Sequence, residues 1–434
     1  MNILIGVIVG LVVLMILVVL HELGHFIAAR RNGVNVLEFG IGFPPRAIAW
    51  IKDSKTGKWR RLPRKEWSKE KATKVIYSDG DKTFAQKGMV FSINWLPIGG
   101  FCQMDGESAA DDRKGTFGAA SFWKKTKILF AGVAMNWLAA IVVLTVLAWT
   151  GMPEFLDNQF TVAEDTRIEW VPIEIKLVED DSPASRAGLM TGDFILSIDG
   201  EVVKYASEVT DYDRAHAGEV VNFKIIRGVN RECIKKQNCD SETCECAKNA
   251  EILEYAVTLN EADSEYLLGV KMESSQAMTY STWSAPLVGV GLTAQITGQT
   301  FKGVGEMLWN LLRGVGSLFS FDSNVREEGQ AAISAVGESV SGPVGIIGVL
   351  FPTFTSMGPA NLAFLAAIIS ISLACMNVLP IPALDGGRWL LIAIYKLRRK
   401  ELTKKTEERI VSRAFIVLLI LMFAVTVLDI VRFF

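Results

Sequence analysis

The sequence predicts a polytopic α-helical membrane protein of about four transmembrane helices, with membrane-associated β-hairpins and an inserted β-rich domain. Three observations support this class. The 434 residues are 50% hydrophobic, with a mean hydropathy of +0.30, although charged residues still make up 21%. Apolar runs long enough to span a bilayer recur along the chain, and basic residues gather between alternate runs. The net charge of −2 gives no argument for binding to nucleic acid, and we expect none.

The apolar runs are each near the roughly 20 residues that a spanning helix needs. They cover residues 3–20, 128–152, 361–383 and 414–431. They define spans at 1–31, 127–152, 361–387 and 414–434. The first run could be mistaken for a secretory signal, but such a signal has a basic start and a small-residue cleavage site. Here the run starts Met-Asn-Ile-Leu and ends at His-Glu-Leu-Gly-His, so we expect the first span to be retained.

The placement of Lys and Arg predicts the orientation of the spans. Basic residues are concentrated in segments 32–126 and 388–413. Acidic residues instead follow the second span: Glu154, Asp157, Glu164 and Asp165. By the positive-inside rule both basic segments are cytoplasmic. Segment 153–360 and both termini are then expected to be extracytoplasmic.

Segment 32–126 contains two extended, glycine-punctuated stretches, residues 34–51 and 89–104, separated by a polar insertion at 53–87. Both stretches are apolar enough to enter the membrane as β-hairpins. Lipid does not tolerate exposed backbone polar groups, so re-entrant hairpins must pack on protein or line a wet cavity. Hairpins lying on the cytoplasmic surface of the membrane fit the sequence equally well.

Segment 160–272 has the pattern of a compact β-rich domain. An alternating strand comes first, and a short helix then begins at Ser182 and ends at Gly188. A further strand leads to Asp199-Gly200, a typical hairpin pair. This order, with the pattern SPA-x-x-AGL-x-x-GD, resembles the bacterial form of the PDZ domain. The resemblance implies a groove that receives extended peptides, including peptide termini, by strand addition.

The cysteines fall into two groups. Cys102 and Cys375 lie in apolar surroundings and are expected to be small core residues. The others crowd the expected extracytoplasmic domain: Cys233, Cys239, Cys244 and Cys246. Disulfides suit that compartment. Because the spacing of this cluster is not a recognised zinc pattern, disulfides are favoured over a second metal site.

Residues 283–358 follow the β-rich domain and lead to the third span. They are rich in glycine and moderately apolar, and residues 300–320 have an amphipathic pattern. A helix of this kind is typical of the membrane interface. We therefore expect 283–358 to be an amphipathic interfacial region.

His21-Glu22-Leu23-Gly24-His25 is the motif with the strongest chemical meaning. On a helix, His21 and His25 project from one face, so both imidazoles can reach one ion. Glu22 lies beside them and can act on a metal-bound water as a general base. The motif stands at the end of a spanning helix, where ionisable side chains are costly and usually functional; a merely interfacial cluster is the less favoured alternative. The third histidine, His216, lies in a polar stretch and is expected at the surface.

A zinc ion with a catalytic role needs a third protein ligand and one open position. The third span ends in Asn-Val-Leu-Pro-Ile-Pro-Ala-Leu-Asp-Gly-Gly, where two prolines break the helix before Asp385. The third span enters from outside, so Asp385 reaches the cytoplasmic side, at the depth of the two histidines. We therefore expect Zn²⁺ to be held by His21, His25 and Asp385. A role as a helix-ending turn residue is the alternative for Asp385.

These features resemble the site-2 protease family, RseP-type (peptidase family M50), over most of the chain. The shared features are H-E-x-x-H in the first span, N-x-x-P-x-P-x-L-D-G in a later one, and a PDZ-like domain between them. The resemblance implies zinc on His21, His25 and Asp385. It also implies that Glu22 is the catalytic base and that Asn377 contacts the substrate backbone. This chain differs in having a single PDZ-like unit and a cysteine-bearing insertion.

The resemblance further implies where the enzyme works and on what. It places a multi-pass zinc metalloendopeptidase in the bacterial inner (cytoplasmic) membrane, with its PDZ-like domain outside. Its substrates would be single-span membrane proteins cut within the bilayer, such as anti-sigma factors and signal-peptide remnants. The lipid bilayer is then its immediate surrounding.

A spanning helix has its backbone hydrogen bonds satisfied, so it must unwind before it can be cut. An extended edge of the enzyme, at residues 39–42 or near Asn377, could then pair with the unwound strand. The candidate substrate-binding residues are Asn377, Pro380, Pro382, Gly40 and Gly42.

Two other classes of protein fit parts of this pattern. A zinc transporter would usually carry more histidines and acidic residues within its spans than this chain does. A non-catalytic membrane scaffold that uses only the PDZ-like groove would not need Glu22 and Asp385, and both are present. The sequence therefore favours the enzyme.

Overall fold

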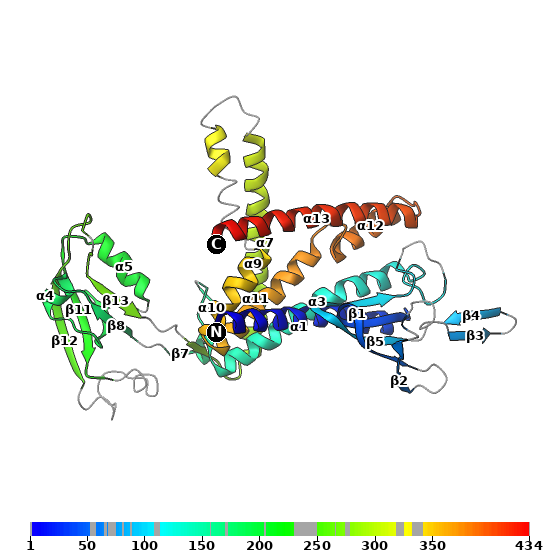
Figure 1. Ribbon diagram of the computed structural model, residues 1–434. Coiled ribbons are helices and arrows are strands. Elements are labelled where there is room, and N and C mark those ends of the chain that lie inside the picture. Colours follow the sequence, from blue (N-terminus) through cyan, green and yellow to red (C-terminus); the bar gives the residue numbers. More distant parts are fainter. Residues whose placement is uncertain are drawn as a thin grey trace. The chain divides into compact units, whose positions relative to one another are not determined.

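The computed structural model describes most of the chain, in two units (Figure 1). One unit comprises Met1–Val146 with Pro286–Phe434, and the other Leu147–Ala285. The described residues are 2–52, 58–64, 67, 75–79, 82–86, 89–107, 113–156, 158–169, 172–203, 205–229, 250–264, 266–273, 278–317, 325–331 and 342–433. The cluster of Cys233, Cys239, Cys244 and Cys246 lies outside these residues, so its disulfides stay a prediction. Part of the predicted insertion at 53–87 also lies outside them.

Four of the described helices are long and apolar enough to cross a membrane, which is the predicted number. They are α1 (Asn2–Arg31), α3 (Phe122–Thr150), α11 (Pro359–Val378) and α13 (Lys404–Phe433). Large apolar side chains stay exposed on them, as with Phe423 of α13, which is 70% exposed. Apolar surface of this extent suits lipid better than water. The first unit is therefore the part of a multi-pass membrane protein that carries its spans.

The third spanning helix is shorter than the sequence suggested. It ends at Val378, because Pro380 and Pro382 have no N–H to continue the hydrogen-bond ladder. A tight turn follows, and α12 (Asp385–Leu397) begins at once. Two glycines make this turn possible. A Cβ at Gly386 would lie 2.1 Å from the Val378 carbonyl oxygen, and one at Gly387 would lie 2.0 Å from that of Ile381.

The predicted basic loop at 388–413 is largely helical. It consists of α12, a short connection and the start of α13 at Lys404. Asp385 is thus the first residue of a helix and not an isolated turn residue. A carboxylate in that position is stabilised by the N-terminal end of the helix dipole.

The two extended stretches predicted around 34–51 and 89–104 form long, bent antiparallel strands in the first unit. They are β1 (Val36–Lys52) and β5 (Val90–Met104), and the short β2 (Trp59–Arg61) completes a sheet in the order β2-β1-β5. The strands fold back on each other, so Phe39 pairs with both Cys102 and Phe91. A separate hairpin is formed by β3 (Val75–Asp79) and β4 (Lys82–Gln86).

The sheet packs on the spanning helices and is not free in lipid. Phe39 and Cys102 share a buried core with Ala29 of α1 and with Ile128 and Leu129 of α3. This packing meets the requirement that non-helical backbone in a membrane be covered by protein.

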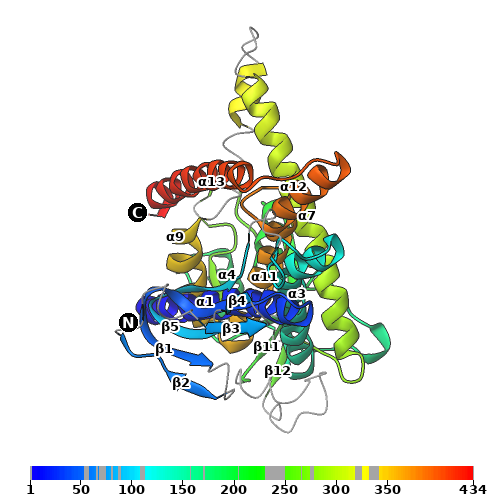
Figure 2. The ribbon, with the colours of Figure 1, turned by 90° about the vertical axis from the view of Figure 1, so that its right-hand side faces the viewer.

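Region 283–358 is helical in its described parts. It contains α7 (Ala285–Ser317), followed later by α9 (Pro343–Gly345), a π-helical turn (Ile346–Leu350) and α10 (Phe351–Ser356). Figure 2 shows α9 between α13 and α1. Asp429 of α13 accepts hydrogen bonds from the backbone N–H groups of Gly342 and Gly345, at 3.1 and 2.8 Å. Location of this region at the membrane interface stays a prediction.

The second unit is built on an antiparallel sheet in the order β12-β11-β9-β8-β13, with β10 beside β9. The strands are β8 (Ile173–Val178), β9 (Phe194–Ile198), β10 (Glu201–Val202), β11 (Val220–Arg227), β12 (Glu251–Thr258) and β13 (Val270–Glu273). Two helices accompany them, α4 (Pro183–Ala187) and α5 (Ala206–Ala215). A smaller sheet joins β6 (Met152–Pro153), β14 (Met278–Tyr280) and β7 (Arg167–Glu169), after the 3-10 turn Ala163–Asp165.

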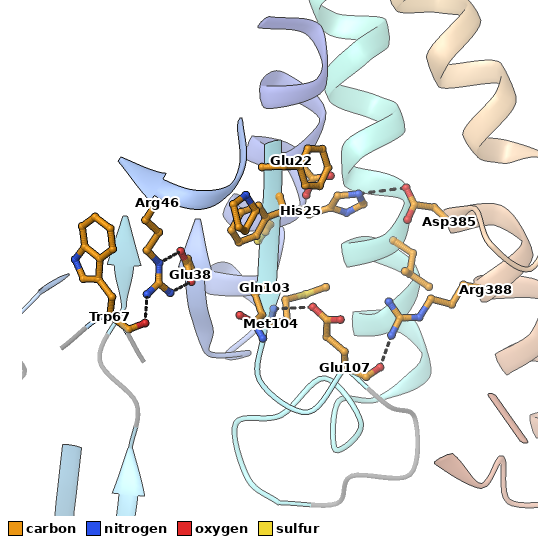
Figure 3. Close-up of a pocket in the computed structure, with 15 residues that line it drawn as sticks. Glu22, His25, Glu38, Arg46, Trp67, Gln103, Met104, Glu107, Asp385 and Arg388 are labelled. Atoms are coloured by element: carbon orange, nitrogen blue, oxygen red, sulfur yellow. Dashed lines mark hydrogen bonds and ion pairs between the residues drawn. The ribbon is translucent and has the colours of Figure 1, made fainter. Parts of the chain in front are cut away.

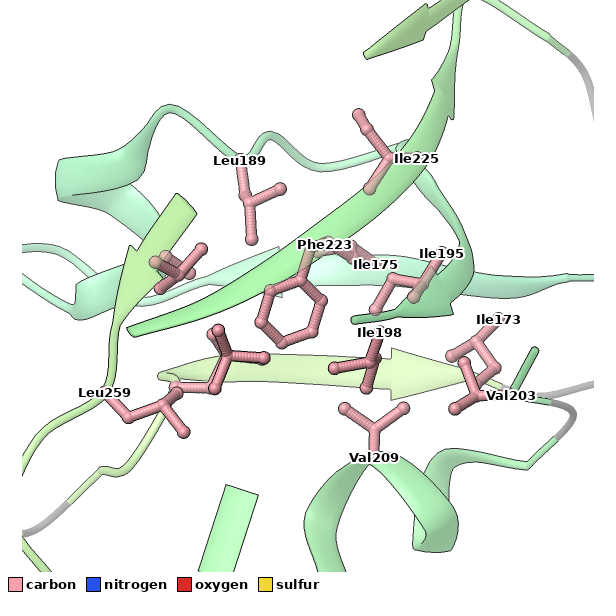
Figure 4. Packing of buried hydrophobic residues seen from close by; sticks show 14 residues of the cluster. Ile173, Ile175, Leu189, Ile195, Ile198, Val203, Val209, Phe223, Ile225 and Leu259 are labelled. Carbon is pink, nitrogen blue, oxygen red and sulfur yellow. The ribbon is translucent and has the colours of Figure 1, made fainter. Parts of the chain in front are cut away.

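One apolar core holds this sheet to its helices (Figure 4). Phe223 of β11 lies at its centre and is fully buried, together with Ile175 and Ile198 from neighbouring strands. Val209 closes the core from α5. The alternation of apolar residues predicted for the first strand is what puts Ile173 and Ile175 on this inner face.

The motif SPA-x-x-AGL-x-x-GD has a structural explanation. Ser182 caps α4 by accepting a hydrogen bond from the Ser185 N–H, and Gly188 ends that helix at φ 92°. The final aspartate, Asp193, is 1% exposed and forms a two-pronged ion pair with Arg227, at 2.7 Å for both contacts. The pair fastens the start of β9 to the end of β11.

Substitution Asp193→Ala is expected to destabilise the second unit by about 3–5 kcal/mol, because it leaves the partly buried Arg227 without its partner. Hydrogen exchange of the full chain in detergent should show faster exchange in β9 and β11. The control Asp180→Ala changes an exposed acid in the same unit and should leave exchange unaltered. Equal protection in Asp193→Ala and the control would contradict this role.

Candidate metal centre

The two histidines of the first span face one point in the interior of the first unit. His21 and His25 lie one turn apart on α1 and are 8% and 7% exposed. Their Nε2 atoms are 3.1 Å apart. Two neutral imidazoles at this distance can share one proton, but when each ring carries its proton on Nδ1, both Nε2 lone pairs are free to bind one metal ion.

Asp385 completes the set from the opposite end of the sequence. Its Oδ2 lies 3.1 Å from His21 Nε2 and 3.2 Å from His25 Nε2. Tetrahedral zinc holds nitrogen and oxygen ligands at about 2.0–2.1 Å, which puts the ligand atoms roughly 3.3 Å from each other. The three residues therefore fit the ion that the sequence predicted, and among the described residues they are the one such group of metal-ligating side chains.

Contacts behind the histidines fix which ring nitrogen faces the centre. His25 Nδ1 donates to the carbonyl oxygen of Ile128, at 2.8 Å. Nδ2 of Asn136, a fully buried residue of α3, lies 3.3 Å from His21 Nδ1. Flipping this amide would let its oxygen, which has no partner among the described residues, accept a hydrogen bond from His21 Nδ1–H. Both Nε2 atoms are then left for the metal.

Two glycines allow α1 and α3 to come close enough for this arrangement. A Cβ at Gly24 would lie 2.3 Å from the Ala131 carbonyl oxygen. A Cβ at Gly132 would lie 2.5 Å from His25 Nε2 and 2.7 Å from His21 Nε2. Any side chain at Gly132 would thus occupy the space next to the metal-binding atoms.

A cavity of about 660 Å³ opens beside the centre (Figure 3). Glu22, His25 and Asp385 line it from the helices, and the end of β5 lines it from the sheet with Phe101, Cys102, Gln103 and Met104. Glu22 therefore shares one space with the metal-binding residues, as the sequence predicted. The opposite wall contains Glu38, which accepts hydrogen bonds from Ser92 at 2.7 Å and from Arg46 Nε at 2.8 Å.

Arg388 holds the helix that carries Asp385. It lies one turn after Asp385 on α12, donates to the backbone carbonyl oxygen of Glu107, and lies 3.5 Å from Glu407 of α13. Figure 3 shows Arg388 reaching Glu107 at the edge of the cavity. These contacts tie α12 to the segment after β5 and to α13, which fixes the position of its first residue.

The structure does not gather the predicted substrate-binding residues around the cavity. Gly40 and Gly42 lie on β1, where Gly40 pairs with Phe101 and with Ser92. Asn377 lies in the last turn of α11 and bonds the Leu373 carbonyl oxygen at 2.9 Å. Pro380 and Pro382 form the turn before α12. None of these five is among the described residues that line the cavity.

Sequence reasoning missed Asn136, Gly132 and Arg388. Asn136 carried a usable signal, since an amide in an otherwise apolar span needs a partner. Gly132 had no comparable signal, because the approach of α1 to α3 depends on the folded packing. His216 belongs to the second unit, where it bonds the Tyr212 carbonyl oxygen at 2.9 Å.

Helix-borne imidazoles and a carboxylate at the spacing of zinc ligands, reached from a cavity that contains a glutamate, define a metal-dependent hydrolase of the membrane. The sequence narrows this class to a family. Peptidase family M50 matches residues 9–62 and 80–422, and the chain belongs to that family. This membership confirms the resemblance to site-2 proteases and the expectation of a metalloprotease that uses Zn²⁺.

Individual relatives agree with the family over nearly their whole length. The chain is similar to the zinc metalloprotease RasP of Bacillus licheniformis, with 26% identity covering 96% of this chain and 97% of the relative. It is likewise similar to the regulator of sigma-W protease RasP of Bacillus subtilis, with 26% identity covering 96% of each.

Substitution Gly132→Ala is expected to lower zinc affinity by about tenfold or more, because the new methyl group displaces the imidazoles. Zinc bound per chain, measured by mass spectrometry of the purified protein during titration with a chelator, tests this. The matched control is Gly298→Ala, where a Cβ meets no atom of the described residues within 4 Å. Wild-type zinc retention in Gly132→Ala would show that the helices do not approach as described.

Substitution Asn136→Leu is expected to weaken zinc binding by about 10–100-fold, because His21 Nδ1–H loses its acceptor. Asn136→Asp keeps an acceptor oxygen and should retain more zinc than Asn136→Leu. The same chelator titration measures both variants. If the two variants lose zinc equally, Asn136 does not orient His21 through its oxygen.

Proposed function

We propose that this chain is an intramembrane zinc metalloprotease that carries out regulated intramembrane proteolysis of single-span membrane proteins. The observation that supports it most is the meeting of His21, His25 and Asp385 beside a cavity lined by Glu22. The two histidines lie on α1, which is apolar enough to span a membrane. Asp385 begins α12, which directly follows the candidate span α11. A site in this position suits a peptide bond that is itself within the membrane.

Each residue of the site has a proposed role. His21 and His25 would hold Zn²⁺ through Nε2, and Asp385 would hold it through Oδ2. When bound, zinc activates a water molecule and polarises the scissile carbonyl group. Glu22 accepts the proton of that water and returns it to the leaving amine. Asn136, Ile128 and Arg388 keep the ligands in position without touching the substrate.

The unwound substrate needs a strand to pair with, and the end of β5 suits this purpose. Residues 100–104 pair with the first half of β1 on one side, and Phe101 to Met104 line the cavity beside Glu22. Strand addition there would lay an extended peptide across the site. Gly40 and Gly42 contribute by shaping the sheet behind that strand, and Asn377, Pro380 and Pro382 by positioning the turn that carries Asp385. Direct contact of Asn377 with substrate remains part of the proposal.

The second unit is proposed to be an extracytoplasmic PDZ-like domain. The order β8, α4, β9 and the hairpin turn at Asp199-Gly200 supports this, as does the free-standing edge strand β13 beside α5. The basic segments at 32–126 and 388–413 support cytoplasmic placement of the site, with both termini outside. The name of the Bacillus subtilis relative, a regulator of sigma-W, favours anti-sigma factors among the substrates, alongside signal-peptide remnants.

Substitution Glu22→Gln is expected to keep bound zinc and to lower cleavage by about 10²-fold or more, because the amide cannot accept the proton of the water. Cleavage of a single-span model substrate reconstituted with the enzyme in liposomes measures this. The control Glu327→Gln changes an exposed acid of the same unit. Undiminished cleavage by Glu22→Gln would refute the role of Glu22, and absence of cleavage by the wild type as well would favour a scaffold.

A further inference from the structure

The second unit contains a groove of its own, of about 560 Å³, between α5 and β13. Thr210, Asp213 and Arg214 line it from α5, and Leu268 to Met272 line it from β13 and the residues before it. Among the described strands, β13 pairs only with β8, so its other edge borders the groove. An extended peptide can pair with such an edge.

A buried acid, Asp213, lines this groove. Asp213 is 4% exposed, and its Oδ1 is buried with no hydrogen-bond partner among the described residues. Burial raises the pKa of Asp213 to about 7, and the nearby His216 lowers it only in part. An unsatisfied buried polar group costs about 1–3 kcal/mol, and a charged one costs more. Leu268 and Met272 line the same groove, so an apolar residue at position 213 would avoid this cost.

The other charged groups at the groove do not satisfy Asp213. Arg214 follows it on α5 and lies 3.4 Å from Asp211, with its side chain 69% exposed. Lys271 is exposed on β13, and Glu179 lies at the end of β8 with a second negative charge. The bases at the rim are thus solvated, and burial favours the protonated form of Asp213. A cation that enters the groove would favour the ionised carboxylate and pair with it.

We propose that this groove binds an extended peptide along β13 and that Asp213 selects a lysine or arginine side chain of that peptide. The proposal deepens the PDZ-like role given to the second unit and rests on it. The amino group of such a side chain would supply the hydrogen bonds that Asp213 lacks, in a place from which water is largely excluded. A peptide with an apolar residue at this point would leave the carboxylate unpaired, and one with an acidic residue would repel it.

If the groove selects a basic residue, the enzyme recognises two parts of its substrate. The metal centre would bind an apolar, unwound segment, and the groove would bind an extended segment with a basic side chain. The groove would therefore favour membrane proteins whose segment outside the membrane carries a lysine or arginine in an otherwise strand-forming stretch. It would disfavour segments that carry an apolar or acidic residue at that position.

The test uses the full chain in detergent micelles with Glu22→Gln, so that peptides are bound and not cut. Fluorescent eight-residue peptides carry Lys, Gln, Leu or Glu at one position, which is moved along the peptide. We expect one position at which Lys binds at least tenfold more tightly than Gln or Leu. Asp213→Asn should abolish that preference, and Asp213→Leu should shift it to Leu.

The control Glu251→Gln changes an exposed acid on β12, at the opposite edge of the sheet, and should keep the preference for Lys. N-terminally acetylated peptides exclude recognition of an α-amino group. Hydrogen exchange of β11 confirms that each variant is folded. Binding without a preference for Lys, or a preference that survives Asp213→Asn, would overturn the proposal and leave the peptide groove standing. Binding of no peptide would overturn both, whereas proteolysis is judged separately by the liposome assay.

Discussion

The close packing of α1 against α3 is the constraint on which the metal centre depends. Gly24 and Gly132 leave no room for a Cβ at the contact, so the backbone of α3 lies against the imidazoles of α1. The same contact brings Asn136 and the Ile128 carbonyl oxygen to the Nδ1 atoms. The positions and orientations of the two imidazoles therefore follow from one helix–helix approach, and both would be lost if the helices separated.

The sheet of β1, β2 and β5 lies beside the metal centre and bears on how a substrate could bind there. A peptide bond within a membrane can be cut only if its helix unwinds, and an unwound strand in lipid needs backbone partners. Under the proposed function, the end of β5 would supply such partners close to Glu22. The same sheet packs on α1 and α3, so its backbone is covered by protein on that side.

Much of this arrangement could be predicted because it depends on local sequence. The apolar runs predicted the four spanning helices, and the i, i+4 spacing of His21 and His25 predicted a shared ion. The proline pair at 380 and 382 predicted the break before Asp385, but not that α12 begins there, since that depends on two glycines packing on the preceding turn. Asn136, Gly132 and Asp213 depend on contacts between distant segments, which a single sequence does not specify.

Helix α13 is held by protein near its two ends and little in between. Its long apolar surface is largely uncovered by protein, yet a buried acid lies near each end: Glu407 is 5% exposed beside Arg388, and Asp429 is 2% exposed at the start of α9. These two acids fix the helix near its ends, and the apolar side chains between them are mostly exposed. The middle of α13 should therefore tolerate apolar residues of many shapes, whereas substitution of either acid should disturb the packing of the helix.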